Sequence, residues 1–191
     1  MSASEATTPS LMDELAGASS EAVSLVDGLV LDSTRALFES YGVELHRDGS
    51  SLAETLPAVQ LVCSIGFSSP ELSGSLLLAI PDPVLEQTLP TPGANLADWS
   101  GELGNQLLGR LKNQLLNYDV AINLALPVVV SGGELSLPAR ARGLMRHFSF
   151  VSEPGRVFIR MAIELSPSAE LVRRTGEGET VGMDEGELIF F

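Results

Sequence analysis

"SGELGNQLLGRLKNQLLN", residues 100–117, has the leucine spacing of an amphipathic helix. If each residue turns the chain by about 100° and Glu102 is placed at zero, five leucines fall between roughly 100° and 240°. These leucines are Leu103, Leu107, Leu108, Leu111 and Leu115. Asp98, Asn105 and Gly109 fall on the opposite side, within about 60° of Glu102. The stretch therefore predicts a helix with one apolar face and one polar face.

The polar face of this helix has two interpretations. Asp98 is a good helix-start residue, so the helix is expected from about 98 to 117, and an acid such as Glu102 in the first turn favours the helix dipole. On this view the polar face is only solvated. Glycine, however, costs about 1 kcal/mol relative to alanine inside a helix. Close packing on a sheet could explain Gly104 on the buried side, whereas Gly109 on the polar side would let another chain approach.

Five other stretches have strand character, and two of them form a predicted hairpin around "SSPEL". The five are residues 58–67, 73–80, 120–126, 141–151 and 156–165. Pro127 directly follows the third stretch and should make its continuation a strand end or a bend. The last two surround the turn "SEPG".

Two further helices are expected, over 20–42 with Gly42 as the stop and over 81–89 with a proline at the start. The order of elements is helix, two strands, helices, three strands. It predicts an α+β fold, with a mostly antiparallel sheet and long helices packed on one face.

The chain has 191 residues, of which 45% are hydrophobic, and this suits one domain with tails. Residues 1–18 are rich in Ser, Ala, Thr and Glu and are expected to be disordered or loosely helical. The folded domain is expected over 19–165. Residues 166–191 are polar and acidic until "ELIFF" and are expected to form a C-terminal tail.

The net charge of −14 argues against binding to a nucleic-acid backbone, which needs clustered Lys and Arg, and against an anionic membrane surface. A basic partner protein would suit it. The first residues lack the basic and apolar regions of a secretory signal, and no apolar run approaches the roughly 18–20 residues of a membrane span. We expect a cytoplasmic protein.

Few residues in this chain could act as a nucleophile. The single cysteine, Cys63, alternates into a core strand and is expected to be buried, and no internal disulfide can form. His147 lies in a predicted strand and His46 in a predicted loop, far apart in sequence. An enzyme with its own nucleophile would need an activated side chain or a metal cluster. We expect no metal site.

The order of elements and the residues of the central helix resemble the CheC/CheX/FliY family of chemotaxis phosphatases, the CheX branch in particular. The matching residues are Asp98 and the Glu-x-x-Asn pair Glu102 and Asn105, in "ELGNQLLG". The hairpin "IGFSSPELSGSLLLAIP" resembles the family's hairpin, and "LALPVVVSGG" resembles its proline-containing strand. The resemblance covers about residues 20–165 and implies a CheX-like fold.

The resemblance implies a hydrolase of two-component signalling that removes phosphate from the aspartyl phosphate of a CheY-type receiver domain. Asn105 would then position the hydrolytic water, and Glu102 would pair with the receiver's lysine. The receiver would supply Mg²⁺, so the protein would need no cofactor of its own. Asp98 is a helix cap or, alternatively, a supporting contact to the partner, and Gly109 would leave room for the partner.

CheC-type members of the family carry two helices with Glu-x-x-Asn. The helix over 20–42 has no such pair, so the resemblance implies a single site, as in the CheX type. CheX-type proteins are dimers, and the alternating strands of this sequence would permit a homodimer. Two alternatives to the phosphatase stay open. One is a non-catalytic adaptor that binds a receiver or a flagellar-switch partner through the same fold. The other is a structural dimer whose polar helix face is merely solvated.

Overall fold

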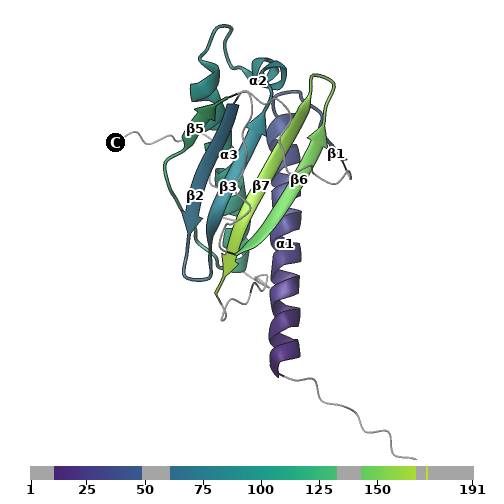
Figure 1. Ribbon diagram of the computed structural model, residues 1–191, viewed down its shortest axis with the longest axis vertical. Coiled ribbons are helices and arrows are strands. Elements are labelled where there is room, and N and C mark those ends of the chain that lie inside the picture. Colours follow the sequence, from purple (N-terminus) through teal and green to yellow (C-terminus); the bar gives the residue numbers. More distant parts are fainter. Residues whose placement is uncertain (1–10, 49–60, 133–142, 167–170, 172–191) are drawn as a thin grey trace, which may run out of the picture.

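The computed structural model of the protein describes residues 11–48, 61–132, 143–166 and 171 (Figure 1). Seven strands of these residues form one antiparallel sheet in the order β1-β6-β7-β3-β2-β4, and β5 also pairs with β2. The strands are β1 (His46–Asp48), β2 (Leu61–Ser68), β3 (Leu72–Ile80), β4 (Asn123–Leu124), β5 (Val128–Ser131), β6 (Leu144–Val151) and β7 (Arg156–Leu165).

The helices α1 (Leu11–Glu39) and α3 (Leu96–Leu115) lie on the same face of this sheet (Figure 1). A short helix, α2 (Asp82–Thr88), precedes α3, and a single 3₁₀ turn, η1 (Leu116–Tyr118), follows it. α3 contacts α1 on one side and the strands β2, β3 and β5 beneath it. This arrangement confirms the predicted α+β fold with long helices on one face. Among the described residues, none of the helices is long and apolar enough to cross a membrane.

The predicted helices are present, with shifted limits. The first begins at Leu11 rather than at 20 and ends at Glu39. The second is α2, and Pro81 stands at its N-cap, as the proline signal indicated. The third begins two residues before the predicted start at 98.

Four of the predicted strands correspond to β2, β3, β6 and β7, and β7 has the predicted limits 156–165. The prediction over 120–126 was wrong in extent, because only Asn123 and Leu124 pair with β2. The continuation after Pro127 was also wrong, since β5 resumes the pairing with β2 there. Proline has no N–H to donate to the ladder, so it divides this edge into two short strands.

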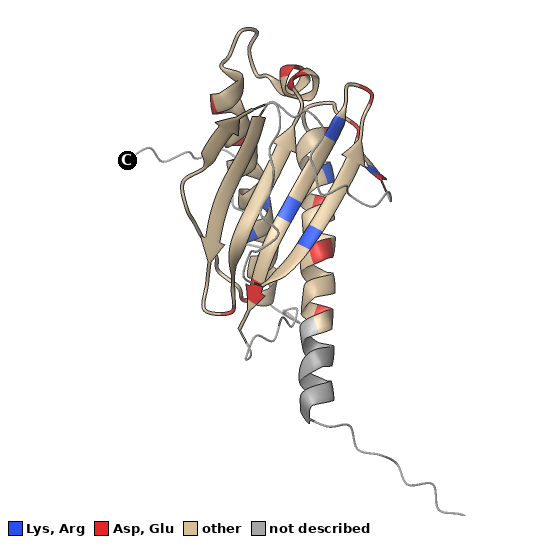
Figure 2. Cartoon of the chain, in the orientation of Figure 1, with Lys and Arg blue, Asp and Glu red and all other residues tan. Residues whose placement is uncertain are grey.

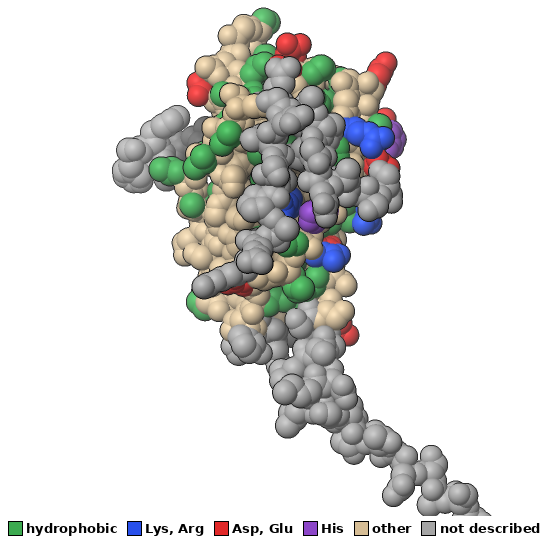
Figure 3. Space-filling view, viewed as in Figure 1, with side chains coloured by type: hydrophobic (Ala, Val, Ile, Leu, Met, Phe, Trp, Pro, Cys, Tyr) green, Lys and Arg blue, Asp and Glu red, His purple; other side chains and the backbone are tan. Residues whose placement is uncertain are grey.

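Strand β5 presents large hydrophobic side chains to solvent at the edge of the sheet (Figure 3). Val128 is 60% exposed and Val130 is 45% exposed, while Leu126 just before the strand is 87% exposed. The intervening Val129 packs against the core. The alternation of a strand therefore holds in β5, although its outward side chains are apolar.

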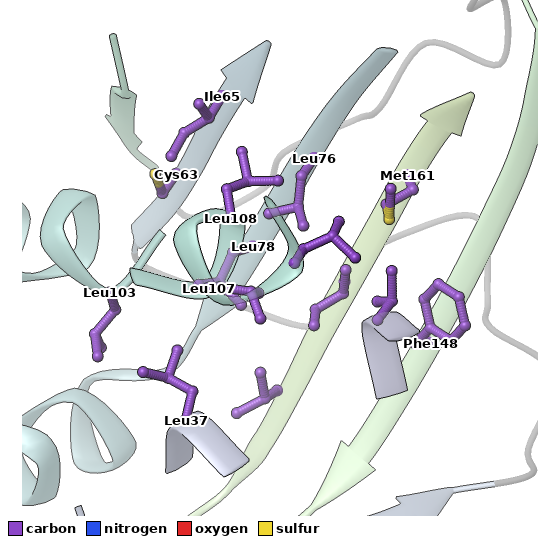
Figure 4. Close-up of a cluster of buried hydrophobic side chains, with 14 of the residues drawn as sticks. Leu37, Cys63, Ile65, Leu76, Leu78, Leu103, Leu107, Leu108, Phe148 and Met161 are labelled. Carbon is purple, nitrogen blue, oxygen red and sulfur yellow. The ribbon is translucent and has the colours of Figure 1, made fainter. Parts of the chain in front are cut away.

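The core lies between the sheet and the two long helices (Figure 4). The five leucines predicted on the apolar face of α3 are at most 1% exposed. They belong to one buried cluster with alternate residues of the sheet and one side of α1, including Leu37, Cys63, Ile65, Leu76, Leu78, Phe148 and Met161. Burying a leucine side chain contributes about 1.5–3 kcal/mol, so this face anchors α3 firmly to the sheet.

Two ion pairs add polar ties around the core. The carboxylate of Asp27 on α1 accepts two hydrogen bonds from Arg146. One comes from Nε of Arg146, at 2.8 Å, and the other from a terminal nitrogen of the same guanidinium group. Arg156 of β7 pairs with Asp48 of β1 at 2.6 Å. Figure 2 shows basic residues on β6 and β7 and acidic residues along α1, the arrangement that the first pair requires.

Candidate functional site

The helix α3 has the two faces that its sequence predicted. Its buried residues are Ser100, Gly101, Leu103, Gly104, Leu107, Leu108, Leu111 and Leu115. On the opposite side Asp98 and Glu102 are exposed, and Asn105 and Gly109 are half-buried. All four predicted site residues therefore lie along one open side of a helix whose other side is fixed in the core.

The glycines of α3 differ in what surrounds them. A Cβ atom on Gly104 would lie 2.6 Å from Sγ of Cys63 and 3.0 Å from Cδ1 of Ile65. Close packing of the helix on β2 thus explains Gly104, as predicted. A Cβ atom on Gly109 would meet no atom within 4 Å. The surface above Gly109 is open, which is the geometry that an approaching chain would need.

The start of α3 corrects one expectation about Asp98. The N-cap is Asn95, whose side-chain oxygen accepts hydrogen bonds from the backbone N–H of Ala97 at 2.8 Å and of Asp98 at 3.2 Å. Asp98 is therefore not the cap. It is the third residue of the helix, three residues after the N-cap Asn95. Acidic residues are common at this position. Its carboxylate is exposed at the positive end of the helix dipole.

The carboxylate of Glu102 belongs to a hydrogen-bond chain that the sequence analysis missed. Oε1 of Glu102 accepts a hydrogen bond from Nε2 of Gln106 at 3.1 Å. Oε1 of Gln106 in turn accepts one from the hydroxyl of Tyr41 at 2.7 Å. The i, i+4 spacing of Glu102 and Gln106 is a signal for such a contact, whereas nothing in the sequence pointed to Tyr41.

Tyr41 is held by the way in which α1 ends. The N–H of Gly42 donates to the carbonyl of Glu39 at 2.9 Å, and the N–H of Val43 donates to that of Phe38 at 3.0 Å. This is the hydrogen-bond pattern of a Schellman motif, and it requires Gly42 in the left-handed region, where its φ is 73°. The predicted stop at Gly42 is confirmed. The turn fixes the backbone of Tyr41 beside α3.

Asn105 lies one turn after Glu102 on the same side of α3. Among the described residues, none forms a hydrogen bond with its half-buried side chain. The amide thus keeps its oxygen as an acceptor and its NH₂ group as a donor for a bound molecule. Together Glu102 and Asn105 present a negative charge and an unused amide on a rigid base.

The cysteine and the histidines lie apart from this face. Cys63 is fully buried beneath Gly104, and burial raises the pKa of its thiol to about 11. His147 is on β6, opposite Arg160 of β7, and partial burial together with Arg160 and Arg146 lowers the pKa of its ring. His46 was expected in a loop and instead begins β1, an edge strand too short to give a sequence pattern.

No group of three or more His, Cys, Asp or Glu side chains within the described residues is arranged to hold a metal ion. A cavity of about 390 Å³ lies at the end of α1, lined by Arg35, Glu39 and residues 42–45. None of the predicted site residues lines it.

No family model and no curated protein matches this sequence. Solved structures do match its fold. A CheC-like superfamily protein from Shewanella sp. PV-4 is 23% identical with a TM-score of 0.64, and the match covers 73% of this chain and 97% of that one. The chemotaxis protein CheX from Vibrio vulnificus is 21% identical with a TM-score of 0.63, over 71% of this chain and 97% of that one.

CheX in a CheX–CheY–BeF₃–Mg²⁺ complex from Borrelia burgdorferi also matches, with 12% identity and a TM-score of 0.55. That match covers 72% of this chain and 96% of the other. The TM-scores establish a shared fold, and identities of this size establish nothing further. The chain therefore has the fold of the CheC-like and CheX chemotaxis proteins, as the resemblance of its sequence implied.

Proposed function

We propose that this protein hydrolyses the aspartyl phosphate of a CheY-type receiver domain. The observation that supports the proposal is that Glu102 and Asn105 lie one turn apart on the open face of α3, in a CheX-like fold. One structural relative is a complex of CheX with CheY, which supports a receiver domain as the partner.

The reaction asks little chemistry of the protein itself. Water adds to phosphorus, the bond between phosphorus and the aspartate oxygen breaks, and the products are a carboxylate and inorganic phosphate. An acyl phosphate is already labile, so the main barrier left to lower is the placement of the water in line with the breaking bond. The amide of Asn105 does this by accepting a hydrogen bond from the water, and it takes no proton.

Glu102 docks the receiver in this proposal. Its exposed carboxylate pairs with the lysine of the receiver's active site, and that pair holds the receiver on the face that carries Asn105. The receiver supplies its own Mg²⁺, so the phosphatase needs no cofactor of its own. The open surface above Gly109 leaves space for the receiver, and the exposed carboxylate of Asp98 makes a supporting contact.

The test is to follow the release of inorganic phosphate from phosphorylated CheY-type receivers, with and without the full chain, in the presence of Mg²⁺. We expect the protein to shorten the phosphate lifetime of its cognate receiver. Glu102→Ala should raise the KM for the receiver about tenfold, because a docking ion pair is lost. Glu86→Ala is the matched control, since Glu86 is an exposed glutamate on the neighbouring helix α2.

Two other outcomes would replace this proposal. Stable binding to a phosphorylated receiver with an unchanged phosphate lifetime would make the protein a non-catalytic adaptor. An absence of binding to every receiver, phosphorylated or not, would leave the face of α3 as a solvated surface.

A further inference from the structure

The chain of hydrogen bonds from Tyr41 through Gln106 to Glu102 joins the end of α1 to the open face of α3. Tyr41 donates to Oε1 of Gln106 at 2.7 Å, and Nε2 of Gln106 donates to Oε1 of Glu102 at 3.1 Å. Gln106 and Tyr41 are both half-buried, whereas Glu102 is exposed. The chain thus runs from a packed part of the molecule to a charged group in solvent.

The two ends of the chain determine the orientation of the Gln106 amide. A carboxylate only accepts hydrogen bonds, so it selects the NH₂ end of the amide, and the amide oxygen is then left for a donor. The hydroxyl of Tyr41 is that donor. With the amide reversed, its oxygen would face the carboxylate oxygen of Glu102 and the contact would be repulsive.

Tyr41 is itself held on two sides. Its ring meets the ring of Trp99 edge to face, with centroids 5.5 Å apart. Nε1 of Trp99 donates to Oγ1 of the buried Thr88 at 2.9 Å, so α2 and α3 together fix the indole. The Schellman turn at Gly42 fixes the backbone of Tyr41. The hydroxyl therefore presents a fixed donor to Gln106.

We propose that Gln106 and Tyr41 are positioning residues, which hold the Glu102 carboxylate in place for the receiver's lysine. This inference rests on the proposed function. An exposed glutamate samples many rotamers, and a partner must immobilise it on binding. A bond from Gln106 to Oε1 restricts those rotamers in advance and leaves Oε2 and further acceptor sites on the carboxylate for the lysine.

A purely structural tie between α1 and α3 would use the same kind of bond, and the protein contains one. Oγ of Ser33 donates to Oε1 of Gln114 at 3.1 Å, two turns further along α3. Among the described residues, no chain of hydrogen bonds links Gln114 to Glu102. The pair Ser33 and Gln114 is therefore a matched control for Tyr41 and Gln106.

The experiment measures kcat and KM for the phosphorylated receiver with the full chain, with four variants of the two hydrogen-bonded pairs, and with Glu102→Ala alone and combined with two of them. We expect Gln106→Met and Tyr41→Phe each to raise KM about three- to tenfold and to leave kcat within about twofold. Gln114→Met and Ser33→Ala should leave both constants unchanged. In a Glu102→Ala background, Gln106→Met and Tyr41→Phe should have no further effect on KM. Urea unfolding of each variant shows whether the fold is intact.

The positioning role is overturned if Gln106→Met leaves KM unchanged, if the control pair raises KM as much, or if the effect persists without Glu102. If the wild-type protein dephosphorylates the receiver and this activity depends on Asn105, these results would refute only the positioning role. A wild type that does not shorten the phosphate lifetime of any receiver would refute the proposed function, and the positioning role with it.

Discussion

Gly104 and Gly109 lie five residues apart on α3 and meet opposite surroundings. A Cβ atom at Gly104 would collide with Cys63 and Ile65, while one at Gly109 would stand in open space. Both glycines weaken the helix by a similar amount compared with alanine. Close packing explains why position 104 needs a glycine, whereas nothing in the structure requires a glycine at position 109. The difference separates a face that holds the fold together from a face that is free to bind.

The leucine face should show the largest effect on stability. Leu107 is 1% exposed, and Leu107→Ala removes buried methyl groups and leaves a cavity. We expect a loss of about 2–5 kcal/mol in the free energy of unfolding, measured by urea titration. A loss below about 1 kcal/mol would contradict the placement of this face in the core. Asn113→Ala, at an exposed position of the same helix, is the control.

Gly104→Ala should be the next most damaging change. The added methyl group would need space now filled by Sγ of Cys63, which is part of the sheet and has little freedom to move. Overpacking of about 1–3 kcal/mol outweighs the gain in helix propensity, so the variant should unfold at a lower urea concentration. Combining it with Cys63→Ala should recover part of the loss. An increase in stability would refute the close packing.

Cys63 makes the buried face sensitive to alkaline pH. Burial raises the pKa of its thiol to about 11 from the ordinary value of 9.0, so the folded protein keeps the proton that the unfolded chain releases. The unfolded state binds fewer protons between these two values, and stability must fall as pH rises. We expect Cys63 to contribute a loss of about 1 kcal/mol between pH 8 and 10.

The measurement for Cys63 is urea unfolding at both pH values, with Cys63→Ala as the comparison. The alanine variant should be less stable at pH 8 and should lose less stability on going to pH 10. Equal pH dependence in the two proteins would show that the thiol ionises as readily in the fold as in the unfolded chain.

Gly109→Ala should have a small effect on stability, of the opposite sign to Gly104→Ala. No atom lies within 4 Å of the new methyl group, so the helix gains propensity without a clash. We expect the free energy of unfolding to rise by up to about 1 kcal/mol. A decrease comparable to that of Gly104→Ala would remove the contrast between the two glycines.

The parts of the structure that could be predicted from the sequence are those with local, periodic signals. The leucines of α3 repeat over several helical turns, and the apolar residues of β7 alternate over several positions. These repeats indicate which face of each element is buried. β1 and β5 have three and four residues. Each is a strand only because it pairs with a strand far away in the sequence, β1 with β6 and β5 with β2. Such short edge strands have no pattern of their own.

The open face of α3 could also be predicted in part. Glu102 and Asn105 lie as their spacing indicated, because helix geometry alone places them. Asn95 was missed as the cap although it stands three residues before an acid, a recognised start signal. Tyr41 lies 65 residues from Gln106 in sequence, and only the packing of α1 on α3 brings the two together.

The most direct test of the division between the two faces is the rate of receiver dephosphorylation by Asn105→Ala, with its unfolding free energy measured in the same preparation. We expect the acceleration to fall at least about 100-fold, since the water is no longer placed, while stability changes by less than about 0.5 kcal/mol. Asn113→Ala, at an exposed asparagine two turns further on α3, should keep the full rate. Normal dephosphorylation by a well-folded Asn105→Ala variant would contradict the account.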